Sequence, residues 1–195
     1  LAIKISGAVQ ASRWTSIPEG GFIHSFNGPH SLFVDTIRSC RILVTSHLMG
    51  HRYHAEGDIK ISLLERALQH IVSTAKYSIY YGEGRDTYDV WGRTAHESIF
   101  NTNDGQYRCP NTQQGYSGFS TWTRGLAWAM LGFSEELEAF ADLEDSAFET
   151  LGGKENIIKT MEKAAQACCD FYIEHTPTCG VCYWDTGAPN LHKIG

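Results

Sequence analysis

NTQQGYSGFSTWTRGLAWAMLGFSEELEAF, residues 111–140, is the stretch that does most to decide the fold of this chain. It opens as a polar, glycine-rich loop and continues as an apolar run that is long enough for a helix, with Ser120 as a suitable N-cap. We therefore predict a helix over about 121–140 that is entered from an exposed loop.

Three further helices are expected around this one. Apolar residues recur at helical spacing over about 29–49, 58–80 and 154–174. The helices at 29–49 and 121–140 are apolar around most of their circumference, whereas the other two carry a charged face. This alternation predicts an all-α fold with two inner–outer hairpins, the repeating unit of an α/α toroid.

Little β-structure is expected, because runs of Val, Ile and Thr bounded by turns are scarce. Short strands are predicted only near 86–90 and 181–184. The long polar connection at 82–119 should lie at one end of the toroid, where binding loops gather.

Composition restricts the classes of partner. The chain has 195 residues and a formal net charge of −6, which suits a single domain and argues against nucleic acid and anionic membranes as partners. No apolar run approaches the roughly 20 residues of a membrane span, and no signal peptide is visible in a sequence that starts at Leu1. Whether the protein is cytoplasmic or periplasmic in a bacterium is left open.

The six cysteines give one candidate metal motif, the C-x-x-C element at Cys179 and Cys182. A structural zinc site needs four ligands, and a second clean pair is lacking. We therefore predict no metal.

The 111–128 segment groups residues that suit an acidic sugar. Its amides Gln113 and Gln114 precede Trp122, Arg124 and Trp128, and the last two share a helix face because they are four residues apart. A guanidinium beside aromatic planes suits a planar carboxylate on a ring with hydroxyl groups. The alternative is a core helix whose tryptophans only pack.

Asp35 is the candidate acid. It is surrounded in sequence by apolar residues within the predicted 29–49 helix, and a lone carboxylate there is costly to bury unless it is paired or protonated. A protonated carboxyl is what general acid catalysis requires. The alternative is an ion pair with Arg38 or with a neighbouring helix.

An ordered set of motifs resembles glycoside hydrolase family 88, the unsaturated glucuronyl hydrolases. The motifs are GGFIHSF (20–26), LFVDTIRS (32–39), TQQGYSGFSTWTRGLAW (112–128) and YWDTGAP (183–189). The W-x-R-G-x-A-W form favours this family over the related unsaturated rhamnogalacturonyl hydrolases. The resemblance implies an (α/α)6 barrel, to which residues 1–195 would contribute about two hairpins. As a single domain incomplete at both ends, the chain would need the rest of its own barrel or a second chain.

The resemblance also implies an activity. The family removes unsaturated uronic acid from the non-reducing end of polysaccharide-lyase products by hydrating the C4–C5 vinyl ether. By position, Asp35 would be the acid/base, Gln114 and Arg124 would hold the uronate carboxylate, and Trp122 and Trp128 would wall the sugar ring. The reaction needs no metal or organic cofactor.

Two departures from the family pattern affect the site. Gln113 stands where members usually have His, and Tyr88-Asp89-Val90 stands where they have Tyr-His-Val. Asp89 is therefore expected as a substrate contact or as a second carboxylate near Asp35. His96 and His30 are other imidazoles that the sequence does not place in the site. The alternatives to the hydrolase are a non-catalytic acidic-saccharide-binding α/α module and an unsaturated rhamnogalacturonyl hydrolase-like enzyme, and the polysaccharide that supplies the substrate stays open.

Overall fold

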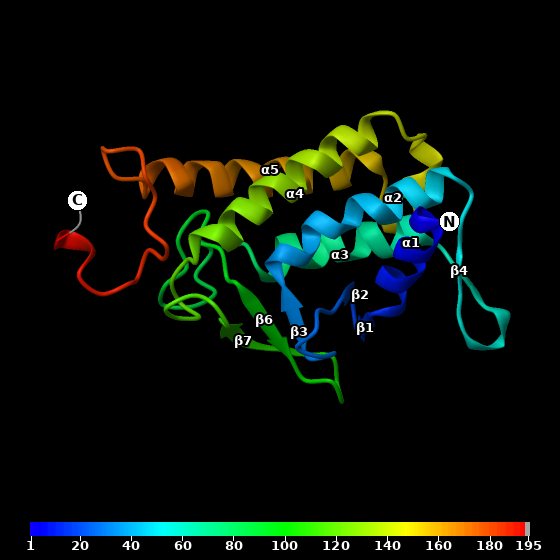
Figure 1. Cartoon of the computed structure of the whole chain (residues 1–195), viewed down its shortest axis with the longest axis horizontal. Helices are drawn as coiled ribbons and strands as arrows, with labels where there is room; N and C mark the ends of the chain where they lie inside the picture. Colours follow the sequence, from blue (N-terminus) through cyan, green and yellow to red (C-terminus); the bar gives the residue numbers. More distant parts are fainter. Residues whose placement is uncertain (194–195) are drawn as a thin grey trace.

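The computed structural model describes residues 1–193, apart from the side chains of residues 56, 150, 151 and 192, and it is mainly helical (Figure 1). Its α-helices are α1 (Ala2–Ser12), α2 (Cys40–Leu48), α3 (Leu63–Tyr77), α4 (Thr123–Ala141) and α5 (Lys154–Glu174). Shorter 3-10 segments are η1 (Val34–Ser39), η2 (Glu56–Asp58), η3 (Asp145–Leu151) and η4 (Leu191–Lys193).

Two helical hairpins form the body of the protein. Helix α2 packs on α3, and α4 packs on α5 and on η1, so that one core runs between the four helices (Figure 1). Large side chains that are fully buried in this core include Ile37, Leu43, Leu68, Phe133 and Phe140. At the bend between α4 and α5, Phe140 meets Phe148 edge to face at 5.4 Å.

The sequence located three of the predicted helices well. Helix α5 has the predicted bounds, and α3 is shorter than the predicted 58–80 because Ser62 caps it by accepting from the backbone N–H of Glu65 at 3.2 Å. Helix α4 starts at Thr123, so the predicted N-cap is wrong. Trp122 occupies the N-cap, and the Ser120 hydroxyl instead donates to the Ser117 carbonyl at 3.1 Å.

The predicted 29–49 helix is wrong at its first half. Ser31–Phe33 is a strand, β3, and the chain then passes through η1 before α2 begins at Cys40. Strand β3 pairs antiparallel with β6 (Glu97–Phe100), and the backbone N–H of Val34 extends the contact by donating to the His96 carbonyl at 3.0 Å. Leu32, Phe33 and Val34 are all buried, so this apolar run is covered on every side. A helix or strand with only one buried face would leave some of these side chains exposed.

Short strands are more numerous than predicted and lie elsewhere. The predicted strands at 86–90 and 181–184 are absent from the described part of the chain, where residues 86–90 form a turn and Asp185 makes one bridge to Trp122. Three antiparallel sheets contain the strands β1 (Trp14–Ile17) with β2 (Gly20–Ile23), β3 with β6 and β7 (Tyr107–Asn111), and β4 (Tyr53–His54) with β5 (Lys60–Ile61).

Helix α1 was not predicted from the sequence. It packs on α2 where Gly7 approaches Ser46 so closely that a Cβ at residue 7 would lie 2.3 Å from the Ser46 Oγ. That hydroxyl donates to the Ile3 carbonyl at 2.7 Å, which ties the two helices together. Within residues 1–193, no helix is both long and apolar enough to cross a membrane. All six cysteines carry free thiols.

Candidate functional site

Asp35 lies where β3 turns into η1, at the second position of the 3-10 segment. The extended conformation of Phe33 directs the chain into this turn, and Val34 and Ile37 anchor the turn in the core. The Asp35 side chain is partly exposed, but its Oδ1 atom is buried and has no hydrogen-bond partner among the described residues. No ion pair joins it to Arg38 within that part of the chain, so the simple pairing that the sequence allowed is absent.

His96 faces Asp35 from the residue just before β6. Its Nε2 lies 3.8 Å from the Asp35 Oδ1, and the ring is 2 % exposed. Phe33 meets the imidazole edge to face with ring centroids 5.0 Å apart, and Trp122 covers it at 4.4 Å. The sequence named this histidine without placing it, because the β3–β6 pairing that brings it to Asp35 has no local signal.

The hydrogen bonds of His96 determine its tautomer. The backbone N–H of Gln113 points at Nδ1 from 3.2 Å and can only donate, so Nδ1 is an acceptor. Thr112 Oγ1, 3.0 Å from Nδ1, accepts from the Gly115 N–H and can donate to the same nitrogen. The neutral ring therefore carries its proton on Nε2, toward Asp35. Burial lowers the pKa of His96, against the opposing charges of Asp35 and Glu97, which favours this neutral form.

Glu97 ties together the loops on either side of the site. Its side chain is fully buried, and four donors surround its two oxygens. Oε1 accepts from Ser31 Oγ at 2.5 Å and Asn27 Nδ2 at 2.7 Å, and Oε2 accepts from Asn111 Nδ2 at 2.8 Å and Gln113 Nε2 at 3.1 Å. Sequence reasoning missed this residue, since all four of its partners lie at least 14 residues from it in the sequence.

The two glutamines lie together at the start of the loop before α4. Both side chains are exposed. Gln113 is oriented by its bonds to His96 and Glu97, so it lies in the immediate neighbourhood of Asp35. Gln114 follows it along the chain and is brought to the same loop.

The first turns of α4 supply the aromatic and cationic groups. Trp122 is 7 % exposed and covers His96, while the exposed Arg124 has its guanidinium 5.8 Å from the Trp122 ring centre. Trp128 is half-buried, and the guanidinium of Arg38 lies 4.2 Å above its ring. Thus Trp122 of the segment before α4 lies over His96, which faces Asp35, and Trp128 of α4 lies against Arg38 of η1.

A small basin of about 130 Å³ opens beside Asp35. Arg13, Arg38 and His24 are among the residues that line it, and the two arginines give the partly exposed side of the carboxylate a positively charged surface. Burial lowers the pKa of His24, with the nearby Arg13 charge acting in the same direction.

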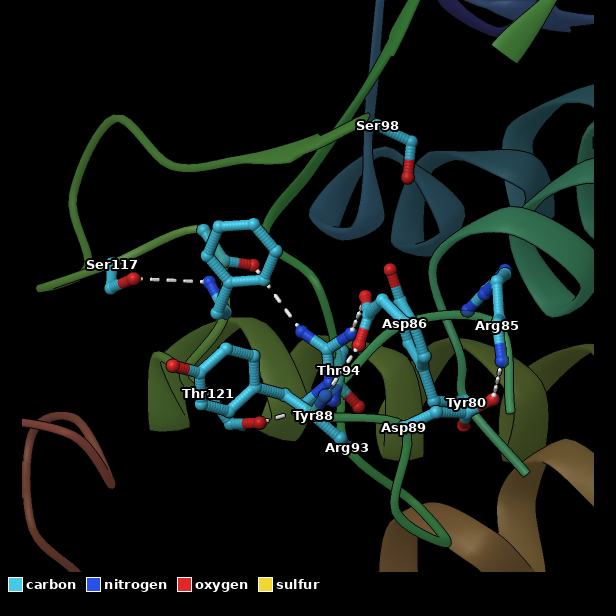
Figure 2. A network of polar contacts seen from close by, with 12 residues as sticks. Tyr80, Arg85, Asp86, Tyr88, Asp89, Arg93, Thr94, Ser98, Ser117 and Thr121 are labelled. Atoms are coloured by element: carbon cyan, nitrogen blue, oxygen red, sulfur yellow. Dashed lines mark hydrogen bonds and ion pairs between the residues drawn. The ribbon is translucent and has the colours of Figure 1, made fainter. Parts of the chain in front are cut away.

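Asp89 is hydrogen-bonded within its own loop. Its carboxylate accepts from the backbone N–H groups of Gly82, Glu83 and Arg85 at 3.0, 3.1 and 2.6 Å, beside Tyr80 and Arg85 in Figure 2. Burial by itself would raise the pKa of Asp89, but these donors and the Arg85 charge lower it overall. These bonds give Asp89 a role in stabilising its own loop, and its expected role as a substrate contact or second carboxylate stays a prediction.

The arrangement combines a carboxyl oxygen without a partner, an N–H donor directed at it, an indole wall and nearby guanidinium groups. Such a set can transfer a proton to a bound sugar and hold an anionic substituent. In the described residues no three His, Cys, Asp or Glu side chains are grouped as metal ligands.

This chain is similar in sequence to a curated protein. No protein-family model matches the chain. The chain is 28% identical to an unsaturated glucuronyl hydrolase from Formosa agariphila over 127 residues, which are 64% of this chain and 26% of that protein. It thus spans about a quarter of the length of this curated relative.

Solved structures of the same name share the fold. The unsaturated glucuronyl hydrolase of Bacillus sp. GL1 matches with a TM-score of 0.65 at 18% identity, over 96% of this chain and 42% of that one. One described as specific for heparin matches with a TM-score of 0.65 at 16% identity, over 96% and 43%. That of Streptococcus agalactiae gives 0.62 at 20% identity, over 95% and 39%. The resemblance is therefore found in both sequence and fold: this chain is similar in sequence to an unsaturated glucuronyl hydrolase and shares the fold of solved structures of that name.

Proposed function

We propose that this protein is a glycoside hydrolase that removes unsaturated uronic acid from the non-reducing end of oligosaccharides by hydrating the C4–C5 vinyl ether. One observation carries the proposal: the unpartnered Oδ1 of Asp35 faces the Nε2–H of His96, 3.8 Å away, under the Trp122 indole. A carboxyl with one open oxygen and a fixed neighbouring donor suits a group that must both give and take a proton.

The reaction begins with protonated Asp35 giving its proton to C4 of the unsaturated sugar. The electron pair of the double bond forms the new C4–H bond, which leaves an oxocarbenium ion at C5 and a carboxylate on Asp35. Water then adds at C5 while Asp35 takes one of its protons. The resulting hemiketal opens the ring and releases the rest of the saccharide, so that one water is consumed and the acid is regenerated.

In this proposal His96 stabilises the carboxylate form of Asp35. At 3.8 Å the two atoms are too far apart for a hydrogen bond, but such contacts often tighten when substrate excludes water. A neutral donor can hydrogen-bond the carboxylate without adding a further positive charge to those that Arg13 and Arg38 bring to the same basin.

Binding follows the roles that the family resemblance implies. Arg124 and Gln114 hold the uronate carboxylate, and Trp122 and Trp128 wall the ring. Trp122 over His96 and Arg124 beside the Trp122 ring support this assignment, and Arg38, which lies over the Trp128 ring, adds a second guanidinium that lines the same basin as Asp35. Arginine suits a planar carboxylate because it can donate two parallel hydrogen bonds.

We further propose that the two hairpins, α2–α3 and α4–α5, are part of an (α/α)6 barrel. The chain covers about two-fifths of the solved structures that it matches. Apolar side chains such as Ile5, Val9 and Leu131 are also exposed on α1 and α4, where further hairpins of the same protein or of a second chain would cover them.

Hydration in D₂O tests the chemistry directly. An unsaturated disaccharide should give a product with deuterium at C4, detected by NMR, because the proton that Asp35 delivers exchanges with solvent. Direct hydrolysis of the glycosidic bond would first release the free unsaturated uronic acid, with its vinyl C4–H unlabelled, before ring opening adds deuterium from the solvent. The appearance of this unsaturated monosaccharide in the early spectra would contradict the proposal.

A further inference from the structure

A cavity of about 520 Å³ lies outside the Asp35 site, between the loop of residues 116–120, the turn that contains Tyr88, and the end of α5. Its volume is in the range of ligand pockets. The same stretch of chain reaches the candidate active site. Gln113, three residues before Tyr116, contacts His96, while Ser117 and Phe119 line the cavity. Between these residues, the backbone N–H of Tyr116 donates to the buried Asp185 at 2.8 Å, which anchors the loop.

The cavity offers exposed aromatic faces. Tyr88 is 55 % exposed and Phe119 is 43 % exposed, and their ring centres are 5.3 Å apart. Tyr116, also lining the cavity, is 54 % exposed. Solvent-exposed rings that meet in a concave surface are suited to stacking against the C–H face of a sugar.

Hydroxyl and imidazole groups provide hydrogen bonds beside these rings. Ser117 Oγ accepts from the Phe119 N–H at 3.1 Å and Thr186 Oγ1 accepts from the Thr121 N–H at 3.0 Å, so each hydroxyl keeps its own proton to donate. His175 donates from Nδ1 to the Phe171 carbonyl at 2.9 Å, which leaves Nε2 of the neutral ring as an acceptor. Two donors and one acceptor beside aromatic faces match a polyol.

The charged groups at the cavity favour an uncharged sugar. Arg93 lines the cavity, but its Nη2 is paired with Asp86 Oδ2 at 2.6 Å and its guanidinium lies 3.5 Å from the Tyr80 ring centre. Arg85 covers the same ring at 3.4 Å, and Figure 2 shows Tyr80, Arg85, Asp86 and Arg93 gathered in one network. Because this charge is already neutralised, the cavity favours an uncharged ring over a second uronate.

We propose that this cavity is a saccharide subsite that binds an uncharged hexose or hexosamine ring downstream of the unsaturated uronate. The inference rests on the proposed function, since it takes the ligand to be the same oligosaccharide that Asp35 acts on. The subsite would add specificity for longer substrates through the Tyr88–Phe119 pair, whereas the residues around Asp35 would bind the terminal uronate.

Kinetics with two substrates test the subsite. The Tyr88→Ala/Phe119→Ala variant should raise KM for an unsaturated tetrasaccharide roughly tenfold. Its kcat/KM for the methyl glycoside of the unsaturated uronic acid, which has no second sugar, should not change. Trp91→Ala is the matched control, because Trp91 is a partly exposed aromatic of the same turn that bonds Asp170 and does not line the cavity. Equal changes for both substrates, or no change for either, would contradict the subsite.

A binding measurement separates the subsite from the proposed activity. Amide NMR shifts of the Asp35→Asn variant would be followed during titration with the same tetrasaccharide. Saturable shifts at Ser117, Phe119 and Thr186 support the subsite, even if the wild-type protein turns nothing over. Shifts confined to residues around position 35 would overturn it and leave the proposed hydrolase intact, and a protein that binds nowhere would overturn both.

Discussion

The backbone N–H of Gln113 donates to Nδ1 of His96 at 3.2 Å, and this bond fixes the proton of the neutral imidazole on Nε2. Nε2 is the nitrogen that faces Asp35. The loop before α4 thus controls the candidate acid through a histidine, and the departure from the family pattern at position 113 leaves this control in place because it uses the main chain.

Two substitutions of His96 should differ in effect. In His96→Gln the side-chain amide can place an N–H where Nε2 is, whereas His96→Asn reaches only the Nδ1 position. We expect kcat to fall about a hundredfold in the Asn variant and about tenfold in the Gln variant. Steady-state kinetics on an unsaturated disaccharide measure this, with circular dichroism to verify folding. If Asn were the milder change, the assigned tautomer would be wrong.

Arg124 should affect substrate binding more than stability, because its side chain is exposed. Arg124→Ala is expected to lower kcat/KM on unsaturated uronides by about 10–100-fold, the value of a charged hydrogen bond to a carboxylate. Lysine should restore little, since it cannot bond the carboxylate in bidentate fashion. The control is Arg108→Ala, which removes an exposed arginine paired with Asp104. Equal losses in both variants would argue against a specific role.

Asp89 should behave as a structural residue. Asp89→Asn weakens the bonds to three backbone N–H groups, so a lower melting temperature is expected, together with a kcat within about threefold of the wild-type value. Thermal unfolding and turnover of the same preparation decide the matter. A drop in kcat comparable to that of Asp35→Asn would restore Asp89 as a catalytic carboxylate.

His70 should make the fold sensitive to acid. Burial lowers its pKa from 6.5 to about 3, and its Nδ1 accepts from the backbone N–H of Ile23 at 3.1 Å. Between these two pH values the unfolded chain binds a proton that the folded chain does not. The free energy of unfolding should therefore fall as pH drops below about 6.5, by up to about 1.4 kcal/mol per pH unit for this group.

The control for this pH effect is His70→Asn. Asparagine keeps an acceptor for the Ile23 N–H but does not titrate, so urea unfolding at several pH values should show a shallower loss of stability in the variant. Parallel curves for the two proteins would mean that His70 is not the group responsible.

The helices could be predicted where local pattern and tertiary packing agree. Helix α5 has the predicted bounds because apolar residues such as Ile157, Met161, Ala164 and Phe171 repeat at helical spacing and face the core. The predicted helix over 29–49 was wrong in its first half because Leu32, Phe33 and Val34 are buried beside β6, through a contact between distant parts of the chain. In such a short apolar run, the sequence pattern does not distinguish a buried strand from a buried helix.

The residues of the candidate site also differ in how well they could be predicted from the sequence. Asp35, Trp122, Arg124 and Trp128 could be named because they lie in motifs that are recognisable within one segment. His96 could not be placed, since only the β3–β6 register carries it to Asp35. The local role of Asp89 was not foreseen: its carboxylate accepts from nearby backbone N–H groups, a common use of aspartate in turns.

Absorbance of the enol-ether band during incubation with lyase-generated unsaturated disaccharides distinguishes hydration by Asp35 from binding alone. We expect that wild-type protein abolishes the absorbance and that Asp35→Asn slows this loss by about 10²–10⁴-fold, the usual contribution of a general acid. A tightly bound disaccharide whose absorbance persists with the wild-type protein would instead identify a saccharide-binding module. Loss of absorbance that proceeds within tenfold of the wild-type rate in Asp35→Asn would contradict the assignment of Asp35 as the acid.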